Sequence, residues 1–406
     1  MIKILIADDS AFMRKVLSDL FAAQPDFEVV GTAINGRDAI EKVKQYDPDL
    51  LTMDVQMPVM DGLNALAVIM EIHPMPVVML SSLTKEGTDE TIRALSLGAV
   101  DFISKAGGSI SRIDTIETDI LAKCRAAAKA NVRSAMAGAR AAERAEKERA
   151  KKKSVSPFMR HIDLPRHAAH EAPKESLERQ PSPFASAKRE NPLLKPRSKV
   201  FMPHSTSSAE AAPPTAGGEK LVAIGTSTGG PQALQSVITR LPKDLPCGVV
   251  VVQHMPPGFT KSLAQRLDSL SAVHVKEAED GDIIRSGCVY IAPGNYHMRV
   301  SGSGGARKIV LGQDPPVGNH RPAVNVLFDS VAPIGRRLVA VIMTGMGSDG
   351  TEGMKKIKAE GGYSIAQDES TSVVYGMPKS VVDAGLADEI RPVTDIARAI
   401  VAAVER

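Results

Sequence analysis

The sequence has few cysteines, little net charge and no long apolar run. Its three cysteines, Cys124, Cys247 and Cys288, show neither disulfide nor metal-site spacing, which favours a reducing compartment. The formal net charge of +3 in 406 residues gives no general reason to bind a polyanion. The apolar N-terminal stretch stops at Asp8, too early for a signal peptide or a membrane span. We therefore expect a cytoplasmic protein of two or three domains without membrane insertion.

Residues 1–122 alternate between apolar strands and amphipathic helices. Ser10 suits an N-cap, because its hydroxyl can accept a hydrogen bond from the first turn. The helix that follows is expected to bury these side chains: Phe12, Val16, Leu17, Leu20 and Phe21. The five expected strands cover residues 2–7, 29–33, 50–54, 76–81 and 99–103. This alternation predicts a parallel sheet with helices on both faces.

Chemically informative side chains follow these strands at their carboxyl ends, where such folds bind ligands. They are Asp8 and Asp9, Asp54, Ser81 and Lys105. Three carboxylates brought together repel one another unless a cation such as Mg²⁺ lies among them. A lysine opposite them suits a phosphoryl group on one carboxylate. Each residue alone has an ordinary explanation, as a helix cap or a surface charge, but their joint placement favours phosphoryl chemistry.

With these residues in place, the segment resembles a two-component receiver domain, a flavodoxin-like fold with a five-stranded parallel sheet. The resemblance implies that Asp54 is phosphorylated by a histidine kinase. It implies an Mg²⁺ site made by Asp8, Asp9, Asp54 and the carbonyl of Gln56. It implies a switch set made by Ser81, Phe102 and Lys105. The sequence departs from the receiver pattern at Ala106, where receivers usually carry proline.

Residues 123–218 separate the receiver from a second domain. From Ile116 to about Lys153 the chain is rich in Ala, Arg, Lys and Glu, and this stretch can extend the last receiver helix. Its basic excess is more typical of a solvated helix than of a nucleic-acid site. From Ser154 onward the chain is dense in Pro, Ser and charge without a hydrophobic period, which predicts a disordered linker.

A second α/β pattern covers residues 219–406. Its expected strands cover residues 221–225, 248–253, 288–292 and 338–343. Residues 296–301 and 308–311, joined through glycines, suggest an antiparallel hairpin at a sheet edge. The pattern predicts a doubly wound α/β domain with an antiparallel edge hairpin.

The run Gly225-Thr226-Ser227-Thr228-Gly229-Gly230-Pro231 follows the first of these strands. Glycines permit a sharp turn, and Pro231 suits the first position of a helix. Ser227 is therefore expected at the tip of a strand–turn–helix, beside the positive end of the helix. Such a turn can hold a phosphate, present a nucleophile or simply cap the helix. It lacks the lysine of a P-loop.

His254 and Asp349 each follow a later strand, so both can face the same crevice as Ser227. A serine hydroxyl becomes nucleophilic when an imidazole takes its proton and a carboxylate orients that imidazole. The segment fits the G-x-S-x-G pattern of α/β-hydrolases, but the order Ser, His, Asp does not. His297 competes with His254 for the role of base. From the residues alone, a nucleophile, a phosphate-binding turn and a helix cap all stay open for Ser227.

Longer motifs distinguish between these alternatives. Gln253-His254-Met255-Pro256-Pro257-Gly258, His320-Arg321-Pro322 and Thr344-Gly345-Met346-Gly347-Ser348-Asp349-Gly350, together with the serine turn, resemble the chemotaxis protein-glutamate methylesterase family, CheB. The resemblance implies Ser227 as nucleophile, His254 as base and Asp349 as orienting acid. It also implies that Met346 contributes an oxyanion-hole N–H and that Thr228 lies beside the nucleophile.

The family resemblance further implies a reaction and its control. The expected reaction is hydrolysis of glutamate γ-methyl esters on methyl-accepting chemotaxis receptors, with deamidation of particular glutamines, in chemotaxis adaptation. The unphosphorylated receiver is expected to cover the catalytic face until Asp54 is phosphorylated by the chemotaxis histidine kinase. We expect no cofactor in the catalytic domain, no nucleic-acid partner and a monomer.

Overall fold

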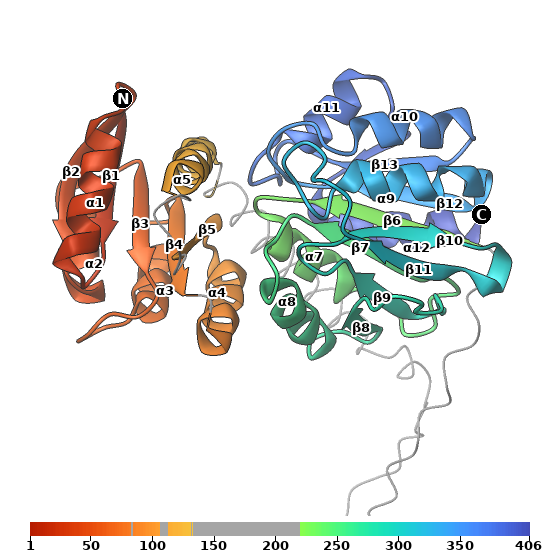
Figure 1. The fold of residues 1–406 in the computed structure, drawn as a ribbon, viewed down its shortest axis with the longest axis horizontal. Helices are drawn as coiled ribbons and strands as arrows, with labels where there is room; N and C mark the ends of the chain where they lie inside the picture. The colour runs from red at the N-terminus through yellow and green to blue at the C-terminus, as the bar shows by residue number, and fades with distance from the viewer. Residues whose placement is uncertain (83, 106–112, 131, 133–219) are drawn as a thin grey trace, which may run out of the picture. The chain divides into compact units, whose positions relative to one another are not determined.

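Apolar strands form two parallel sheets in this computed structural model (Figure 1), one in the N-terminal and one in the C-terminal part of the chain. The structure describes residues 1–82, 84–105, 113–130, 132 and 220–406. The described residues of 1–146 and 214–406 belong to one compact unit. Among the described helices, none is long and apolar enough to cross a membrane.

The N-terminal sheet has five strands in the order β2-β1-β3-β4-β5, and every neighbouring pair is parallel. The strands are β1 (Ile2–Ala7), β2 (Phe27–Ala33), β3 (Leu50–Asp54), β4 (Val77–Ser82) and β5 (Asp101–Lys105). This order is that of flavodoxin-like folds, so the predicted receiver architecture is confirmed. The strand order reverses between β1 and β3, where Asp8, Asp9 and Asp54 lie.

Polar N-caps start four of the helices around this sheet. The helices are α1 (Ala11–Ala22), α2 (Gly36–Tyr46), α3 (Gly62–Ile72), α4 (Lys85–Leu97) and α5 (Ile113–Ala128). Ser10, Asn35, Asp61 and Thr84 each accept a backbone hydrogen bond in the first turn of the helix that follows. These side chains satisfy donors that a helix start would otherwise leave open, which is why the helices begin there.

Two expectations for this domain are wrong in detail. In α1, Leu17 and Phe21 are buried as expected, but Phe12 is 73% and Val16 is 41% exposed, because both lie on the outer side of the helix. Strand β5 begins two residues later than expected and includes Lys105 as its last residue. The predicted continuation of α5 towards Lys153 lies mostly outside the described residues, and α5 itself ends at Ala128.

The C-terminal sheet has seven strands in the order β14-β13-β12-β6-β7-β9-β8, again all parallel. They are β6 (Leu221–Thr226), β7 (Gly248–Gln253), β8 (His274–Glu277), β9 (Cys288–Ile291), β12 (Leu338–Ile342), β13 (Tyr363–Gln367) and β14 (Glu389–Arg391). The order reverses between β6 and β12, so the crevice of a doubly wound fold is expected at that point.

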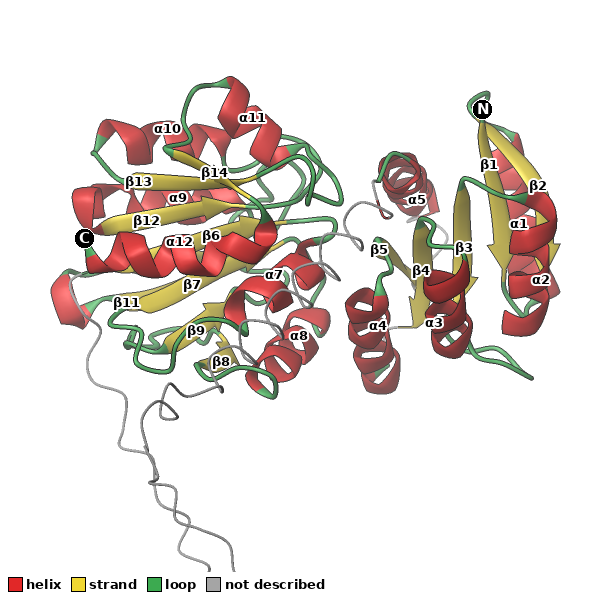
Figure 2. Cartoon of the chain, turned by 180° about the vertical axis from the view of Figure 1, so that it is seen from behind, coloured by secondary structure: helices red, strands yellow, loops and turns green. Residues whose placement is uncertain are grey.

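Helices cover both faces of this sheet, which confirms the doubly wound prediction. Helices α7 (Gly230–Ile238), α8 (Phe259–Asp268) and α12 (Val393–Glu405) lie in front of the sheet in Figure 2. Helices α9 (Val324–Val331), α10 (Thr351–Ala359) and α11 (Met377–Asp383) pack in a row on the opposite face. The central strands β6 and β7 are buried along their whole length, as parallel strands covered on both faces must be.

The predicted antiparallel hairpin is present as β10 (His297–Ser301) and β11 (Lys308–Gly312). It forms a two-stranded sheet of its own rather than an edge of the large sheet. Strands β8, β13 and β14 were not predicted. Two of them are the outermost strands of the sheet, and their short sequences HVKE and EIR carry too few apolar residues to stand out. All three cysteines are free and buried.

We predict that Gly225→Ala destabilises the C-terminal domain by about 1–3 kcal/mol, the usual cost of overpacking. A methyl group at Gly225 would lie 2.4 Å from Cγ1 of Val324 at the start of α9. The free energy of unfolding, from urea titrations followed by circular dichroism, measures the effect. In a Val324→Ala background the same substitution should cost at least about 1 kcal/mol less, since the clash is gone. Equal costs in the two backgrounds would contradict this explanation.

Candidate functional site

Ser227, His254 and Asp349 lie together at the carboxyl ends of three strands. Ser227 follows β6, His254 follows β7 and Asp349 lies in the loop between β12 and α10. The Nδ1 atom of His254 is 3.2 Å from the Ser227 hydroxyl, and its Nε2 atom is 2.8 Å from a carboxylate oxygen of Asp349. The structure therefore brings the three predicted side chains into one hydrogen-bonded chain.

The sheet register places these residues level with one another. Gly225 pairs with Ile342 on one side and with Val252 on the other. Just beyond the strands, the backbone N–H of Ser227 donates to Thr344 at 3.0 Å, and that of His254 donates to Thr226 at 3.1 Å. The ladder bonds thus continue past the strand ends and hold the loops in place.

The Asp349 carboxylate is held by more than the imidazole. It accepts hydrogen bonds from the backbone N–H groups of Val324 at 2.6 Å and Asn325 at 2.9 Å, the first residues of α9. Burial raises the pKa of Asp349, but the His254 and backbone hydrogen bonds outweigh burial and leave that pKa below its usual value. The side-chain oxygen of Asn325 in turn accepts from the N–H groups of Gly350 and Gly353. Asp349 is therefore fixed as a carboxylate.

A buried glutamine joins the serine turn to the histidine loop. The Gln253 amide nitrogen donates to the carbonyl of Ser227 at 2.9 Å and to that of His254 at 3.1 Å. Its amide oxygen accepts from the Thr226 hydroxyl at 2.6 Å. Neither Gln253 nor Asn325 was predicted as a site residue. The available signals were the position of Gln253 next to His254 and that of Asn325 shortly after His320-Arg321-Pro322.

The two ring nitrogens of His254 have distinct hydrogen-bond partners. A carboxylate only accepts hydrogen bonds, so the proton of the neutral ring lies on Nε2, facing Asp349. The Nδ1 atom is then free to accept the hydroxyl proton of Ser227. The competing candidate, His297, is fully buried in β10 and binds the carbonyl of Pro315 through Nε2, so the structure does not pair it with Ser227.

Backbone N–H groups around Ser227 differ in availability. Those of Gly229 and Gly230 are already bonded, to the carbonyls of Val100 and Ser227, which argues against a free phosphate cradle at this turn. Within the described part of the chain, the N–H groups of Thr228 and Met346 donate no hydrogen bond. Met346 follows Gly345, where an added methyl would lie 2.8 Å from the Ser227 Cβ atom. Both free donors thus belong to segments that adjoin Ser227.

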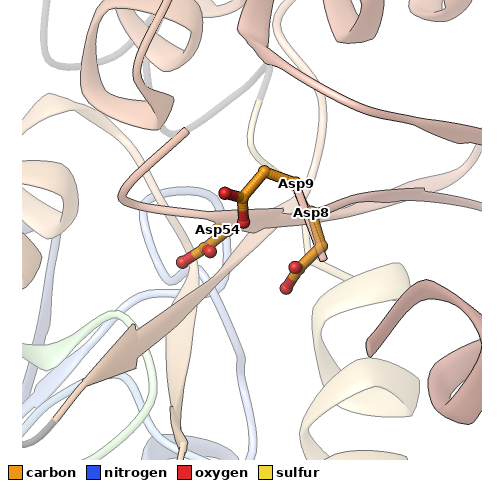
Figure 3. A group of neighbouring side chains, drawn as sticks. All are labelled: Asp8, Asp9 and Asp54. Carbon is orange, nitrogen blue, oxygen red and sulfur yellow. The ribbon is translucent and has the colours of Figure 1, made fainter. Parts of the chain in front are cut away.

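The receiver site brings together three carboxylates and one lysine. Ligand oxygens of Asp8, Asp9 and Asp54 all lie within 4.8 Å of one another (Figure 3). The Lys105 ammonium donates to Asp8 at 2.8 Å and to Asp54 at 2.7 Å. Asp8 and Asp54 are buried, whereas Asp9 is exposed, so the cluster opens to solvent on one side.

The pKa of Asp54 is raised above its usual value, whereas the pKa of Asp349 is lowered. Burial raises the pKa of Asp54, the Asp8 charge raises it further, and the hydrogen bond from Lys105 only partly opposes them. Burial lowers the pKa of Lys105, but its hydrogen bonds to Asp54 and Asp8 outweigh burial and raise it overall. Crowded hard oxygen donors with incomplete charge compensation are the donor set that Mg²⁺ prefers, so the residues fit that ion.

The remaining predicted receiver residues lie around this cluster in different ways. The Ser81 hydroxyl donates to the carbonyl of Gly87 at 3.0 Å and accepts from Thr91 at 2.5 Å, which ties the end of β4 to α4. Phe102 is buried, and its ring lies 4.3 Å from that of Phe259. The N–H of Gln56 points to Asp54 at 3.4 Å. Ala106 lies outside the described residues.

The two parts of the chain match two known family models. Residues 4–116 match the response regulator receiver domain, and residues 222–400 match the CheB methylesterase. The chain is thus a response regulator whose receiver is joined to a CheB methylesterase domain.

Relatives match over almost the whole chain. One, named protein-glutamate methylesterase/protein-glutamine glutaminase, from Symbiobacterium thermophilum, is 46% identical over 99% of this chain and 97% of its own length. Another of the same name, from Geobacillus kaustophilus, is 45% identical over 98% of each chain. The crystal structure of the Thermotoga maritima CheB methylesterase catalytic domain is 49% identical, with a TM-score of 0.44, covering 45% of this chain and 97% of that one. The chain belongs to the protein-glutamate methylesterase/protein-glutamine glutaminase family.

We predict that Asp54→Asn stabilises the receiver by about 0.5–2 kcal/mol at pH 7.5, the usual size of a single stabilising substitution. The pKa of Asp54 is raised in the folded chain, so ionisation of Asp54 costs stability at neutral pH. That cost decreases as the pH falls from the raised pKa towards the ordinary pKa of an aspartate, and the two proteins should converge below that lower value.

Urea unfolding of both proteins across this pH range measures the difference. The control is Asp19→Asn, an exposed carboxylate paired with Lys15, which should change stability by less than about 0.5 kcal/mol. A less stable Asp54→Asn protein at pH 7.5 would contradict the charge argument.

Proposed function

We propose that this protein hydrolyses glutamate γ-methyl esters and deamidates glutamines on methyl-accepting chemotaxis receptors, under control of its receiver. The hydrogen-bonded chain Ser227–His254–Asp349 carries the catalytic part of the proposal. The printed name of the full-length relatives supports the substrate. A cytoplasmic location, a monomeric state and the absence of a nucleic-acid partner stay predictions from the sequence.

In the proposed acylation, the Ser227 oxygen attacks the side-chain carbonyl carbon of the substrate. Its proton passes to Nδ1 of His254, and Asp349 stabilises the resulting imidazolium through Nε2. The tetrahedral intermediate collapses when that proton is delivered to the leaving group, which departs as methanol from an ester or as ammonia from an amide. A water molecule then attacks the acyl-enzyme by the same route and releases glutamate and free Ser227.

The oxyanion of the tetrahedral intermediate must be stabilised by hydrogen-bond donors that have no other acceptor. The backbone N–H groups of Met346 and Thr228 meet that need, since neither donates a hydrogen bond among the described residues. Esters and amides of the glutamate side chain pass through the same acyl-enzyme. One set of residues therefore suffices for both reactions.

We predict that Ser227→Ala abolishes methanol release from methylated receptor membranes and glutamine deamidation together. Asp349→Asn should reduce turnover by about 10⁴-fold, because an amide nitrogen facing Nε2 favours the ring tautomer whose Nδ1 is protonated. The control is Asp329→Asn, an exposed partner of Lys356 in the same domain, which should leave turnover unchanged. Deamidation that persists in Ser227→Ala would require a second nucleophile and contradict the single-site proposal.

The receiver is proposed to accept a phosphoryl group on Asp54 from the chemotaxis histidine kinase. Asp8, Asp9, Asp54 and the Gln56 carbonyl would hold Mg²⁺ there, which when bound neutralises charge on the transferring phosphoryl group. The Lys105 ammonium donates to Asp54, and we propose that it binds an oxygen of the phosphoryl group once Asp54 is phosphorylated. Ser81 and Phe102 are proposed to respond to that change.

Contacts next to the nucleophile support control by occlusion. The Thr228 hydroxyl donates to the Asp101 carboxylate at 2.6 Å, and the Gly229 N–H donates to Val100 at 3.2 Å. On α7, the Gln232 amide donates to the carbonyl of Leu95 at 2.7 Å. The turn that carries Ser227 is thus bonded to β5 and α4 of the receiver. We propose that phosphorylation weakens these contacts, with residues 123–218 as the linker between the receiver (1–122) and the catalytic domain (219–406).

We predict that treating the whole chain with a small acyl phosphate and Mg²⁺ raises the rate of methanol release. A typical coupling free energy of about 1–3 kcal/mol between two sites corresponds to an increase of about 5- to 150-fold. Asp54→Asn should abolish that response. Asp101→Ala removes the carboxylate that binds Thr228, so it should raise the unphosphorylated activity about 5-fold or more. Asp19→Ala, an exposed receiver carboxylate, is the control. Unchanged basal activity in Asp101→Ala would count against occlusion through this contact.

A further inference from the structure

We propose that His320 is a positioning residue for the hydrolysis: its neutral ring covers one face of His254 and stabilises that ring when it carries the proton from Ser227. This inference rests on the proposed function and deepens it. It starts from a contact that none of the roles assigned above uses.

The contact is a parallel stack. The ring centroids of His254 and His320 are 3.8 Å apart, and the ring planes differ by 12°. Both polar edges of His254 are already occupied, by Ser227 at Nδ1 and by Asp349 at Nε2. His320 therefore supplies what the hydrogen bonds cannot, a fixed surface against the face of the ring. Within the described residues the His320 ring itself makes no hydrogen bond, so stacking is its defined contact.

The backbone around His320 is built to hold the ring there. His320 and Val317 exchange two backbone hydrogen bonds, at 3.0 and 3.1 Å. The neighbouring Arg321 guanidinium donates to the Asn295 side chain at 2.6 Å and to the carbonyls of Gln313 and Asp314 at 3.0 Å. A few residues further on, the N–H groups that start α9 bind Asp349. One short segment thus fixes the imidazole by its face and, through Asp349, by its edge.

The charges around His320 favour a neutral ring. Burial and the His254 charge lower the pKa of His320 to about 4, against a weaker opposite effect of Asp349. Asp119 and Lys123 of α5 also face His320, and their effects oppose one another. At neutral pH the ring is therefore uncharged, and its electron-rich face can lie against a cation without repelling it.

This pairing matters most in the transition state. In the proposed acylation, His254 becomes an imidazolium as it takes the serine proton. A cation–π contact is therefore stronger in the transition state than in the ground state, which is the condition for raising the rate of the chemical step. A side chain that merely filled the space would exclude water equally well but would not distinguish the two states.

The test compares two replacements in the whole chain that fill the space with and without an aromatic face. His320→Phe keeps a ring on His254, whereas His320→Leu keeps apolar bulk alone. We expect His320→Phe to retain kcat within about threefold of the parent. His320→Leu should lower kcat by about tenfold, the effect of losing a partly desolvated cation–π contact. KM should be unchanged in both variants. The readouts are methanol release from methylated receptor membranes and the rate at which a fluorophosphonate labels Ser227.

The pH profile separates this role from a structural one. Without an aromatic face the imidazolium is less favoured, so the acid limb of the labelling rate should lie at lower pH in His320→Leu than in His320→Phe. A tenfold effect corresponds to a displacement of about one pH unit. A purely structural residue would lower the plateau and leave the limb in place.

The outcomes are distinct. If Ser227 is labelled in the parent chain but the Phe and Leu variants match in rate and in acid limb, the stacking proposal is overturned and the proposed function stands. If the parent is not labelled at Ser227, the proposed function fails and the inference fails with it. Should either variant fail to fold, the ¹⁵N NMR titration of the parent decides. A His320 ring that stays neutral down to about pH 5 supports the proposal, and one that is charged at pH 7 overturns it.

Discussion

The register of three adjacent parallel strands, β12, β6 and β7, is the constraint on which the candidate catalytic site depends. Because Gly225 pairs with both Ile342 and Val252, the three strands end level, and the backbone bonds at Ser227 and His254 carry that alignment into the loops. A slip of one residue would turn every side chain to the other face of the sheet. In the same alignment, Gly225 lies so close to Val324 that a side chain at position 225 would clash with it. Val324 is the first residue of α9, and its N–H donates to Asp349.

Two buried aspartates show how partners, rather than burial, decide the state of a carboxyl group. Burial raises the pKa of both Asp54 and Asp349. Asp349 receives an imidazole N–H and two backbone N–H groups at a helix start, and these make the anion the stable form. Asp54 shares its lysine with Asp8 and faces that second charge, so its anion stays under-compensated. The first arrangement suits a permanent orienting charge, and the second suits a group that binds a cation and accepts a phosphoryl group.

The turn after Ser227 links the two sites. Its free N–H at Thr228 is a proposed oxyanion donor, while the hydroxyl of the same residue binds Asp101 of β5. Strand β5 also carries Lys105, which bonds to Asp54, and Phe102, which lies against Phe259 at the start of α8. A change in the partners of Lys105 therefore acts on a strand that also contacts the turn after Ser227. This is the physical basis on which the proposed control by phosphorylation rests.

Much of this protein follows from the sequence alone. Alternating apolar strands and helical periods determined both α/β folds. Acidic and hydroxyl residues just after the strands indicated both candidate sites, because parallel strands gather their carboxyl ends at one edge. The exposure of Phe12 and Val16, the separate hairpin and the short strands β8, β13 and β14 required the tertiary structure, since local pattern does not say which face is covered or which strand pairs with which. The roles of Gln253, Asn325 and His320 around His254 also came only from the fold. Hydrogen bonds and ring stacking between segments distant in the chain leave no periodic signal, and only packing decides which side chains meet.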